Sequence, residues 1–429
     1  MRILVSAMVV CLLAVSVGHV SASQEPATAA SLNEQAIKAY QAKDYAAFLA
    51  YEKQALGLDP DNPRIIYNVA CGEALQGNAQ EAVRLLDRLL TRKLDLGAER
   101  DTDFSSIRKT QEWADFESRL AQLRKPLVRS DIAFKLTDPA IVATGIAVDP
   151  RTSDTYIASV RQRKILRRTK QGAVSDFISQ GQDGFLAGAS LAIDSPRHLL
   201  FATTAAAPFM LGFNKEDLGQ SGIFAFDLKS GKTVRKVMLP AGGKRHLLNA
   251  LVVDHHGSVY VSDTGASGIY LLRPETSELE VFIPSSVFTA TQGLALSSDE
   301  KTLYVADYSD GLWAVDIASR TRRHLEAPAG EWLAGLDGLS RVQGGFITVQ
   351  IGVKPERVLR LRLDEKGQRV AAVEVLEMSH PDYEGPIQGV VTGKEFLYVA
   401  NSQLDLGNGE SGAFASDRAR PTIVLRLPF

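Results

Sequence analysis

The sequence predicts a two-part protein in which an all-α set of helical repeats precedes an all-β, six-bladed β-propeller. The first observation behind this prediction is an apolar spacing typical of α-helices in residues 32–124. The second is a change to period-two alternation after Pro126, with one short motif that returns six times. The 429 residues, 45% of them hydrophobic and 23% charged, suffice for two or three domains with sizeable cores.

The first 22 residues have the order of a signal peptide. Arg2 supplies a positive charge, residues 3–17 are almost wholly apolar, and Val20-Ser21-Ala22 is a small-residue cleavage site. The apolar run is short for a membrane span, so an uncleaved anchor is the competing interpretation. We therefore expect a periplasmic or secreted protein that is not inserted in a membrane after cleavage.

Residues 32–124 are predicted to form a tetratricopeptide-like repeat domain. Apolar positions recur after a shift of 34 residues, the tetratricopeptide period: Ala36 matches Ala70, Leu49 matches Val83, and Leu56 matches Leu90. Asn62-Pro63 has the form of a helix start, and residues 103–120 are expected to cap the array. An unrelated helical hairpin is the alternative. A repeat array of this kind would offer a surface to a protein partner.

Cys71 is the only cysteine of the expected mature chain, which leaves no intramolecular disulfide. It lies in an apolar helical stretch, residues 65–71, and this favours a buried structural thiol over a nucleophile. The formal net charge of −2 gives no indication of nucleic-acid binding.

Residues 130–429 are predicted to form the propeller. Motif starts 43 to 60 residues apart are typical of four-stranded blades, and they fall at Thr144, Ala189, Asn249, Gln292, Asp337 and Gln388. A β-sandwich is the competing all-β fold, but it does not explain a repeated motif. The sixth copy ends one strand short, so we expect residues 131–137 to supply that strand and close the ring.

The six motif starts are expected to converge at one rim of the central channel, and five of them are polar. Convergent polar groups in a concavity predict a small-molecule site, with a water-filled channel wall as the alternative. Two long loops, residues 203–222 and 401–421, are expected on the same face, where they would partly cover the site. His246 is the acid–base candidate expected on this face.

The propeller repeat resembles the family of gluconolactonase, regucalcin and luciferin-regenerating enzyme, and more distantly strictosidine synthase. Residues 249–257 and 292–307 carry most of this resemblance. It implies a lactone or ester hydrolase with one divalent cation, calcium or zinc, held by an Asp, an Asn and a Glu.

Carried over by position, the resemblance assigns roles to the ring residues. Asp337 matches the Asp and is the implied catalytic residue and metal ligand, while Gln292 and Thr144 stand where the family has Asn and Glu. Asn249 matches a substrate-binding Asn, and Gln388 and His246 complete the expected substrate-binding set. Because Thr144 brings no charge, we expect a weak cation site.

Two functions follow from these observations. The first is an exported, small-molecule-binding, lactonase-like hydrolase with a degenerate metal site. The alternative is a non-catalytic ligand-binding or scaffold protein whose helical repeats hold a protein partner. The fold alone does not decide between them, because propellers host many functions.

We predict that export removes residues 1–22. Intact-mass measurement of the protein recovered from the periplasm or medium should give a chain that starts near Ser23. A mature chain that still carries Arg2 would contradict this prediction.

Overall fold

The computed structural model describes residues 28–239 and 245–429, so the expected signal peptide lies outside the described residues. The chain divides into two compact units with the boundary after Arg124. The first is helical and the second is a six-bladed β-propeller, as the sequence predicts. Within the described part of the chain, no helix is both long enough and apolar enough to cross a membrane.

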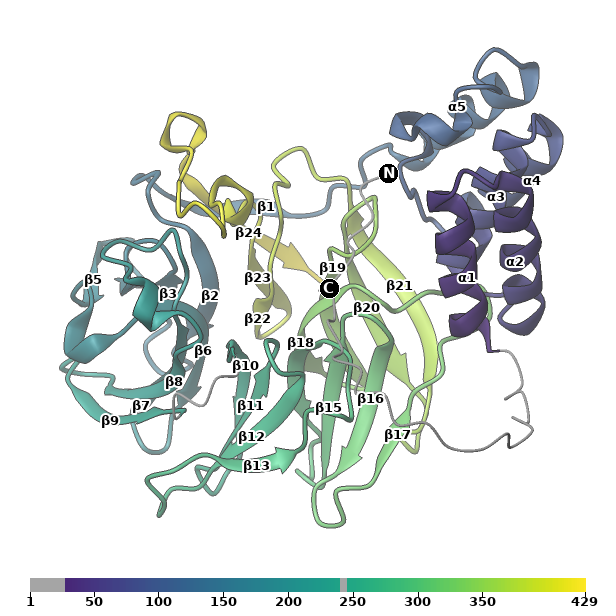
Figure 1. Ribbon diagram of the computed structural model, residues 1–429. Coiled ribbons are helices and arrows are strands. Elements are labelled where there is room, and N and C mark those ends of the chain that lie inside the picture. The colour runs from purple at the N-terminus through teal and green to yellow at the C-terminus, as the bar shows by residue number, and fades with distance from the viewer. Residues whose placement is uncertain (1–27, 240–244) are drawn as a thin grey trace. The chain divides into compact units, whose positions relative to one another are not determined.

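The described residues of the first unit form five α-helices and two short 3-10 helices (Figure 1). They are α1 (Ala29–Gln41), α2 (Tyr45–Leu58), α3 (Pro63–Leu75), α4 (Ala79–Thr91), η1 (Ala98–Arg100), η2 (Thr102–Phe104) and α5 (Gln111–Leu123). Helix α3 starts 34 residues after α1, and α4 starts 34 residues after α2, so the sequence repeat is also a structural repeat. The Asn62 side chain caps α3 by accepting the Arg64 N–H, and Pro63 occupies the first helical position.

The terminal helix is shorter than the sequence predicts. Helix α5 begins at Gln111, where the Thr110 side chain accepts the Trp113 N–H and caps it. Phe104 instead lies in η2, separated from α5 by a turn. The Phe104 and Trp113 ring centroids are 5.5 Å apart and both side chains are buried, so the turn and the helix still share one core.

Each propeller blade is a four-stranded antiparallel sheet (Figure 1). Blade one comprises β2 (Ala143–Val148), β3 (Thr155–Ser159), β4 (Lys164–Arg168) and β5 (Val174–Ile178). Blade two comprises β6 (Ala187–Asp194), β7 (Leu199–Ala205), β8 (Ser221–Asp227) and β9 (Thr233–Met238). Blade three comprises β10 (Leu248–Val253), β11 (Val259–Asp263), β12 (Gly268–Leu272) and β13 (Glu280–Ile283). Blade four comprises β14 (Thr291–Leu296), β15 (Thr302–Asp307), β16 (Gly311–Asp316) and β17 (Arg322–His324). Blade five comprises β18 (Leu336–Val342), β19 (Gly345–Gln350), β20 (Arg357–Leu363) and β21 (Val370–Met378).

Blade six joins the two ends of the propeller. It comprises β22 (Gly389–Thr392), β23 (Glu395–Val399), β24 (Thr422–Pro428) and β1 (Asp131–Leu136). Strand β1 pairs antiparallel with β24, which places Leu136 opposite Thr422. The expectation that this segment completes the sixth blade is therefore confirmed. The first strands of successive blades contact one another in order, and β22 contacts β2, so the ring is closed.

Every interface between neighbouring blades has its own apolar core. Between blades one and two, Phe185 packs edge-on against Phe224 and Phe226, at centroid distances of 5.3 and 5.8 Å. The other five interfaces hold equivalent clusters, including one that joins blade six to blade one. Because each side of a blade is covered by its neighbour, long runs of its strands are buried and apolar.

Glycine in the repeated motif has a steric reason. A Cβ on Gly293 of blade four would lie 2.5 Å from the carbonyl carbon of Gly338 in blade five. A Cβ on Gly145 of blade one would lie 2.5 Å from the carbonyl oxygen of Ala189 in blade two. The innermost strands of neighbouring blades therefore approach too closely for a side chain at these positions.

A buried carboxylate fixes the segment that leads into the propeller. Glu377 of β21 has no exposed surface, and its Oε2 atom accepts the N–H groups of Arg129 and Ser130 at 2.8 Å. Its Oε1 atom accepts the hydroxyl groups of Ser130, Tyr383 and Tyr398. Burial, and then the neighbouring tyrosine and carboxylate, raise the pKa of Tyr398 well above its usual value, so this hydroxyl keeps its proton as a donor.

We expect Glu377→Ala to lower the free energy of unfolding of the propeller by about 3 kcal/mol or more. The substitution leaves buried hydroxyl and N–H donors without an acceptor, and each such loss costs about 1–3 kcal/mol. Urea unfolding followed by circular dichroism would measure the change. Glu395→Ala in the same blade is the control, because its ion pair with Arg426 is half-exposed and worth about 0–1 kcal/mol. Equal midpoints for the two variants would contradict the role of Glu377.

Candidate functional site

The six motif starts line the centre of the propeller in a common local geometry. In blades one to five the pairing of the first two strands shifts register at the motif start; the shifts fall between Ala143 and Gly145, Gly188 and Leu191, Leu248 and Leu251, Thr291 and Leu294, and Asp337 and Ser340. In blade six, Gln388 directly precedes β22. A β-bulge releases a residue from the ladder and re-aims its side chain. All six motif starts are half-buried, and the residue before each is buried, as a channel wall requires.

Hydrogen bonds link these polar ring residues across neighbouring blades. The Asn249 amide nitrogen donates to Gln292 Oε1 at 2.5 Å, which joins blades three and four. The Thr144 hydroxyl donates to the Gly188 carbonyl at 2.7 Å, which joins blades one and two. The backbone N–H of Gln388 donates to Asp337 Oδ2 at 2.9 Å, which joins blades five and six. Three separate hydrogen bonds thus tie polar ring residues to a neighbouring blade, and one of them joins two ring side chains.

Asp337 is the acidic member of this ring. Its carboxyl group loses hydration at the centre of the propeller, and this raises its pKa from 3.8 to about 6. The hydrogen bond from Gln388 opposes the shift only in part. Within residues 28–239 and 245–429, no Lys, Arg or His side chain forms an ion pair with Asp337. The ring thus holds a carboxyl group that changes its protonation state close to neutral pH.

The ring residues fit a tightly bound divalent cation poorly. Asp337 is the only carboxylate at the six positions, and Gln292 Oε1 is already occupied by the Asn249 amide. The Thr144 hydroxyl, which donates a hydrogen bond to the Gly188 carbonyl, is a neutral oxygen and adds no charge. Hard cations gain affinity with the number of charged oxygen ligands, so the weak site expected from the sequence is the most this ring offers.

A different cluster could hold a metal. Among the described residues, the group that brings three metal-ligating side chains together is Cys71, Asp101 and Asp103, all buried in the helical unit. Sequence analysis identified Cys71 as a buried thiol, and this is confirmed, but it did not connect that thiol with the two aspartates. The three residues come from α3 and from the turns η1 and η2, which only the fold brings together.

His246 has a partner that sequence analysis missed. Its Nδ1 atom lies 2.5 Å from Oδ2 of Asp263, and its side chain is only 10% exposed. The other Asp263 oxygen accepts the N–H groups of Leu247, Gly265 and Ala266, so this carboxylate is held rigidly. An Asp in this position fixes the orientation of the imidazole.

Asp263 and Asp307 end the second strands of blades three and four. Asp307 accepts the N–H groups of Thr289, Ala290 and Ser309, just as Asp263 accepts three N–H groups. Both carboxylates therefore organise the loops at the rim rather than offering free ligand oxygens to a cation. The Asp that ends the second strand in blades three and four was visible in the sequence, although its structural role was not.

The two long loops contact each other. In the loop between β7 and β8, Phe209 lies so close to Gly407 of the loop between β23 and β24 that a Cβ at Gly407 would lie 2.5 Å from its ring. The Arg161 guanidinium lies 4.4 Å from the centroid of Phe414 and donates to the Phe209 carbonyl. Apolar residues of both loops pack against one buried cluster around Met210. The loops thus form one joined structure beside blades one and two.

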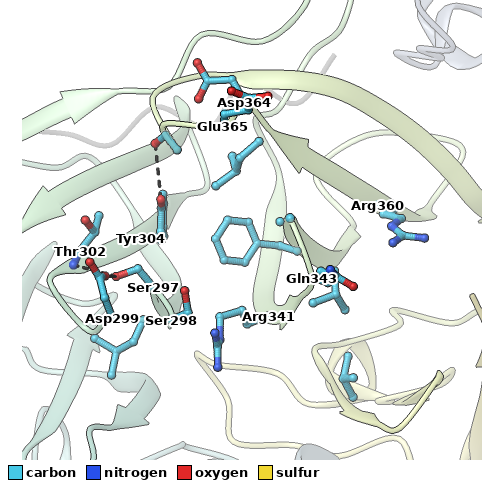
Figure 2. Close-up of a pocket in the computed structure, with 18 of the residues that line it drawn as sticks. Ser297, Ser298, Asp299, Thr302, Tyr304, Arg341, Gln343, Arg360, Asp364 and Glu365 are labelled. Atoms are coloured by element: carbon cyan, nitrogen blue, oxygen red, sulfur yellow. Dashed lines mark hydrogen bonds between the residues drawn. The ribbon is translucent and has the colours of Figure 1, made fainter.

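A hollow of about 950 Å³ lies at the opposite rim, where the first and second strands of blades four to six are joined. Figure 2 shows Tyr304, Arg341 and Arg360 around this hollow. Both basic and acidic side chains line it, including Asp364 and Glu365. The Tyr304 hydroxyl donates a hydrogen bond to the Gly367 carbonyl at 3.4 Å. This surface contains no His, Cys or Ser–His pair, and we place the candidate site at the polar ring.

No family model and no curated protein matches the sequence. Solved structures do match. A gluconolactonase from Xanthomonas campestris is 17% identical, with 70% of this chain and 96% of that chain covered and a TM-score of 0.47. A luciferin-regenerating enzyme is 13% identical, with 71% and 96% covered and a TM-score of 0.49.

A third match is an aldose sugar dehydrogenase from Streptomyces coelicolor, solved in its PQQ-bound form. It is 16% identical, with 70% of this chain and 99% of that chain covered and a TM-score of 0.46. The types of propeller expected from the sequence are thus among the structural neighbours. At these identities the likeness concerns the fold alone.

We predict that Asp337 makes the protein less stable as the pH rises from about 4 to about 6. Its pKa in the folded protein, about 6, exceeds its ordinary value of 3.8. In this pH window the carboxyl group therefore ionises first in the unfolded chain, and this stabilises the unfolded chain relative to the folded one. The full penalty, about 3 kcal/mol, is present above pH 6. Asp337→Asn should therefore unfold like wild type at pH 4 and resist urea better at pH 7.5.

The control for this experiment is Asp405→Asn, which replaces an exposed aspartate in the loop between β23 and β24. It should leave the pH dependence of the urea midpoint unchanged. Identical pH profiles for wild type and Asp337→Asn would show that the carboxyl group has no raised pKa.

Proposed function

We propose that this chain is an exported propeller that binds a small, neutral, polar molecule at the ring and hydrolyses a lactone or ester bond in it. One observation carries the proposal: the ring places a carboxyl group of pKa about 6, Asp337, among neutral amide side chains. A general base works best when its pKa lies near the working pH. Neutral amides bind hydroxyl and carbonyl groups without competing for the proton.

In the proposed reaction, ionised Asp337 takes a proton from a water molecule as its oxygen adds to the carbonyl carbon. The carbon–oxygen ester bond then breaks, and the leaving oxygen takes the proton back from Asp337. Water and lactone give a hydroxy acid, and the enzyme returns to its starting state. Asn249 and Gln388 would orient the substrate, and His246, held by Asp263, would bind it at the rim.

The cation is a separate part of the proposal. Asp337, Gln292 and Thr144 would hold calcium or zinc weakly, and a bound cation would polarise the substrate carbonyl. No step above depends on it. Thr144→Glu would add a second carboxylate and should convert the weak site into a measurable one.

The second candidate function is non-catalytic: the propeller holds a ligand and the helical repeats hold a protein partner. The single carboxylate of the ring is the observation that favours it, because it leaves the chain without the acidic ligand set that the family resemblance implies. Saturable binding of a sugar lactone without turnover would establish this alternative.

We expect the mature protein to hydrolyse at least one member of a panel of γ-lactones, δ-lactones and aryl esters. The rate should rise with pH through about 6 as Asp337 ionises. Asp337→Asn should lower kcat by about 100-fold or more, the usual contribution of a general base. Asp299→Asn at the opposite rim is the control and should keep the wild-type rate.

The same assay tests the cation. Rates that do not change after chelation, with Thr144→Glu gaining calcium- or zinc-dependent thermal stabilisation, fit the proposal. Full activity of Asp337→Asn would overturn the role of Asp337. A panel that is bound in the ring but never hydrolysed would overturn the hydrolase and favour the binding protein.

A further inference from the structure

The helical unit contains a buried cluster of acidic groups that neither the fold nor the proposed reaction uses. Cys71 lies in α3, Asp101 lies between η1 and η2, and Asp103 lies in η2. One ligand atom from each lies within 4.8 Å of the other two. The three residues are 1%, 5% and 6% exposed.

One oxygen of this cluster is left without a partner. Asp103 Oδ1 accepts the Tyr40 hydroxyl at 2.8 Å, whereas Asp103 Oδ2 is buried and accepts no N–H or O–H group. Leaving a buried charged acceptor unsatisfied costs about 1–3 kcal/mol or more. Buried polar atoms without partners are few in native proteins, so this oxygen points to a ligand that would satisfy it.

Two tyrosines hold the carboxylates in place. The Tyr67 hydroxyl donates to Asp101 Oδ2 at 2.9 Å, and the Tyr40 hydroxyl donates to Asp103 Oδ1. Burial raises the pKa of both phenols, so they remain neutral donors. Donors of this kind orient the carboxylate ligands of metal sites and leave the remaining lone pairs for the ion.

We propose that Cys71, Asp101 and Asp103 bind one Zn²⁺ ion that fastens the turn formed by η1 and η2 to helix α3. Zinc accepts a thiolate and carboxylates together, whereas calcium and magnesium take oxygen ligands only. Binding releases the Cys71 proton and any proton on Asp103 to solvent. A water molecule or a second carboxylate oxygen completes four-coordination.

The geometry requires a modest contraction. Cys71 Sγ lies 4.0 Å from Asp101 Oδ2. Zn–S and Zn–O bonds of about 2.3 and 2.0 Å place tetrahedral ligand atoms roughly 3.5 Å apart. Side-chain rotations within the cluster supply this movement, because Asp103 Oδ2 has no bond to break.

Zinc titration of untagged, chelator-stripped mature protein tests the site. We expect one tightly bound ion per chain, a rise in Tm, and a thiolate-to-metal absorption band when Co²⁺ replaces Zn²⁺. Cys71→Ser and Asp103→Asn should each weaken Zn²⁺ binding by more than about 100-fold, because even the substitution of an outer-shell partner costs 10–100-fold. Asp103→Asn should also melt at or above the Tm of metal-free wild type, because it removes a buried, unsatisfied charge.

Glu52→Gln is the matched control. Glu52 is a fully buried carboxyl group of the same unit, its Oε2 atom also lacks a partner, and burial raises its pKa to about 7. Its substitution should leave the Zn²⁺ affinity and the Co²⁺ band unchanged. Asp337→Asn should likewise retain the zinc, which separates this site from the proposed reaction.

Three results would overturn the proposal. The first is a wild-type protein that binds no Zn²⁺ at micromolar concentration. The second is full binding by both Cys71→Ser and Asp103→Asn. The third is binding that is lost in Asp103→Asn but kept in Cys71→Ser without a thiolate band, which would leave a carboxylate site and refute the assignment of zinc.

Discussion

The propeller depends on how closely its innermost strands approach one another. Where Gly293 meets Gly338, two backbones come so near that no Cβ fits between them. Hydroxyl groups bridge other pairs of neighbouring blades: Thr203 of blade two donates to the Asn249 carbonyl of blade three, and Ser262 of blade three donates to the Gln292 carbonyl of blade four. This approach packs the innermost strands of neighbouring blades together at the centre of the propeller, where the motif starts lie. The register shifts beside them turn side chains away from the ladder and toward the channel.

Closure of the ring depends on the segment that enters it. Strand β1 fills the last position of blade six, and the residues just before it donate to the buried carboxylate of Glu377. Pairing of Leu127 with Met378 adds two backbone hydrogen bonds at the same place. The entry and exit of the propeller are thus tied through blades five and six. A ring of six blades closed in this way holds the innermost strands in place, and a preorganised ligand site needs such support.

Five carboxylates of the described residues fall into two groups according to their donors. Asp263, Asp307 and Glu377 each accept several N–H or O–H groups, and they hold the backbone segments that donate to them. Asp337 has one backbone donor, and Asp103 has an oxygen with none. A carboxyl group that the fold leaves short of donors has a raised pKa and can take a proton or a cation. The two proposals made above rest on this second group.

The sequence by itself determined the two-part architecture, the six blades, the strand that closes the ring and the convergence of the polar motif starts. These features follow from local periodicity. One buried face requires an apolar residue at every second position of a strand and at every third to fourth position of a helix. Only the tertiary structure decided which groups meet. Glu377 is hydrogen-bonded to Ser130, His246 lies against Asp263, and Cys71 lies close to Asp103. Such contacts join residues far apart in the chain, and no local pattern specifies them. Their geometry is set by blade closure and by turns such as η2, which shortened the predicted terminal helix and carried Asp103 into the core.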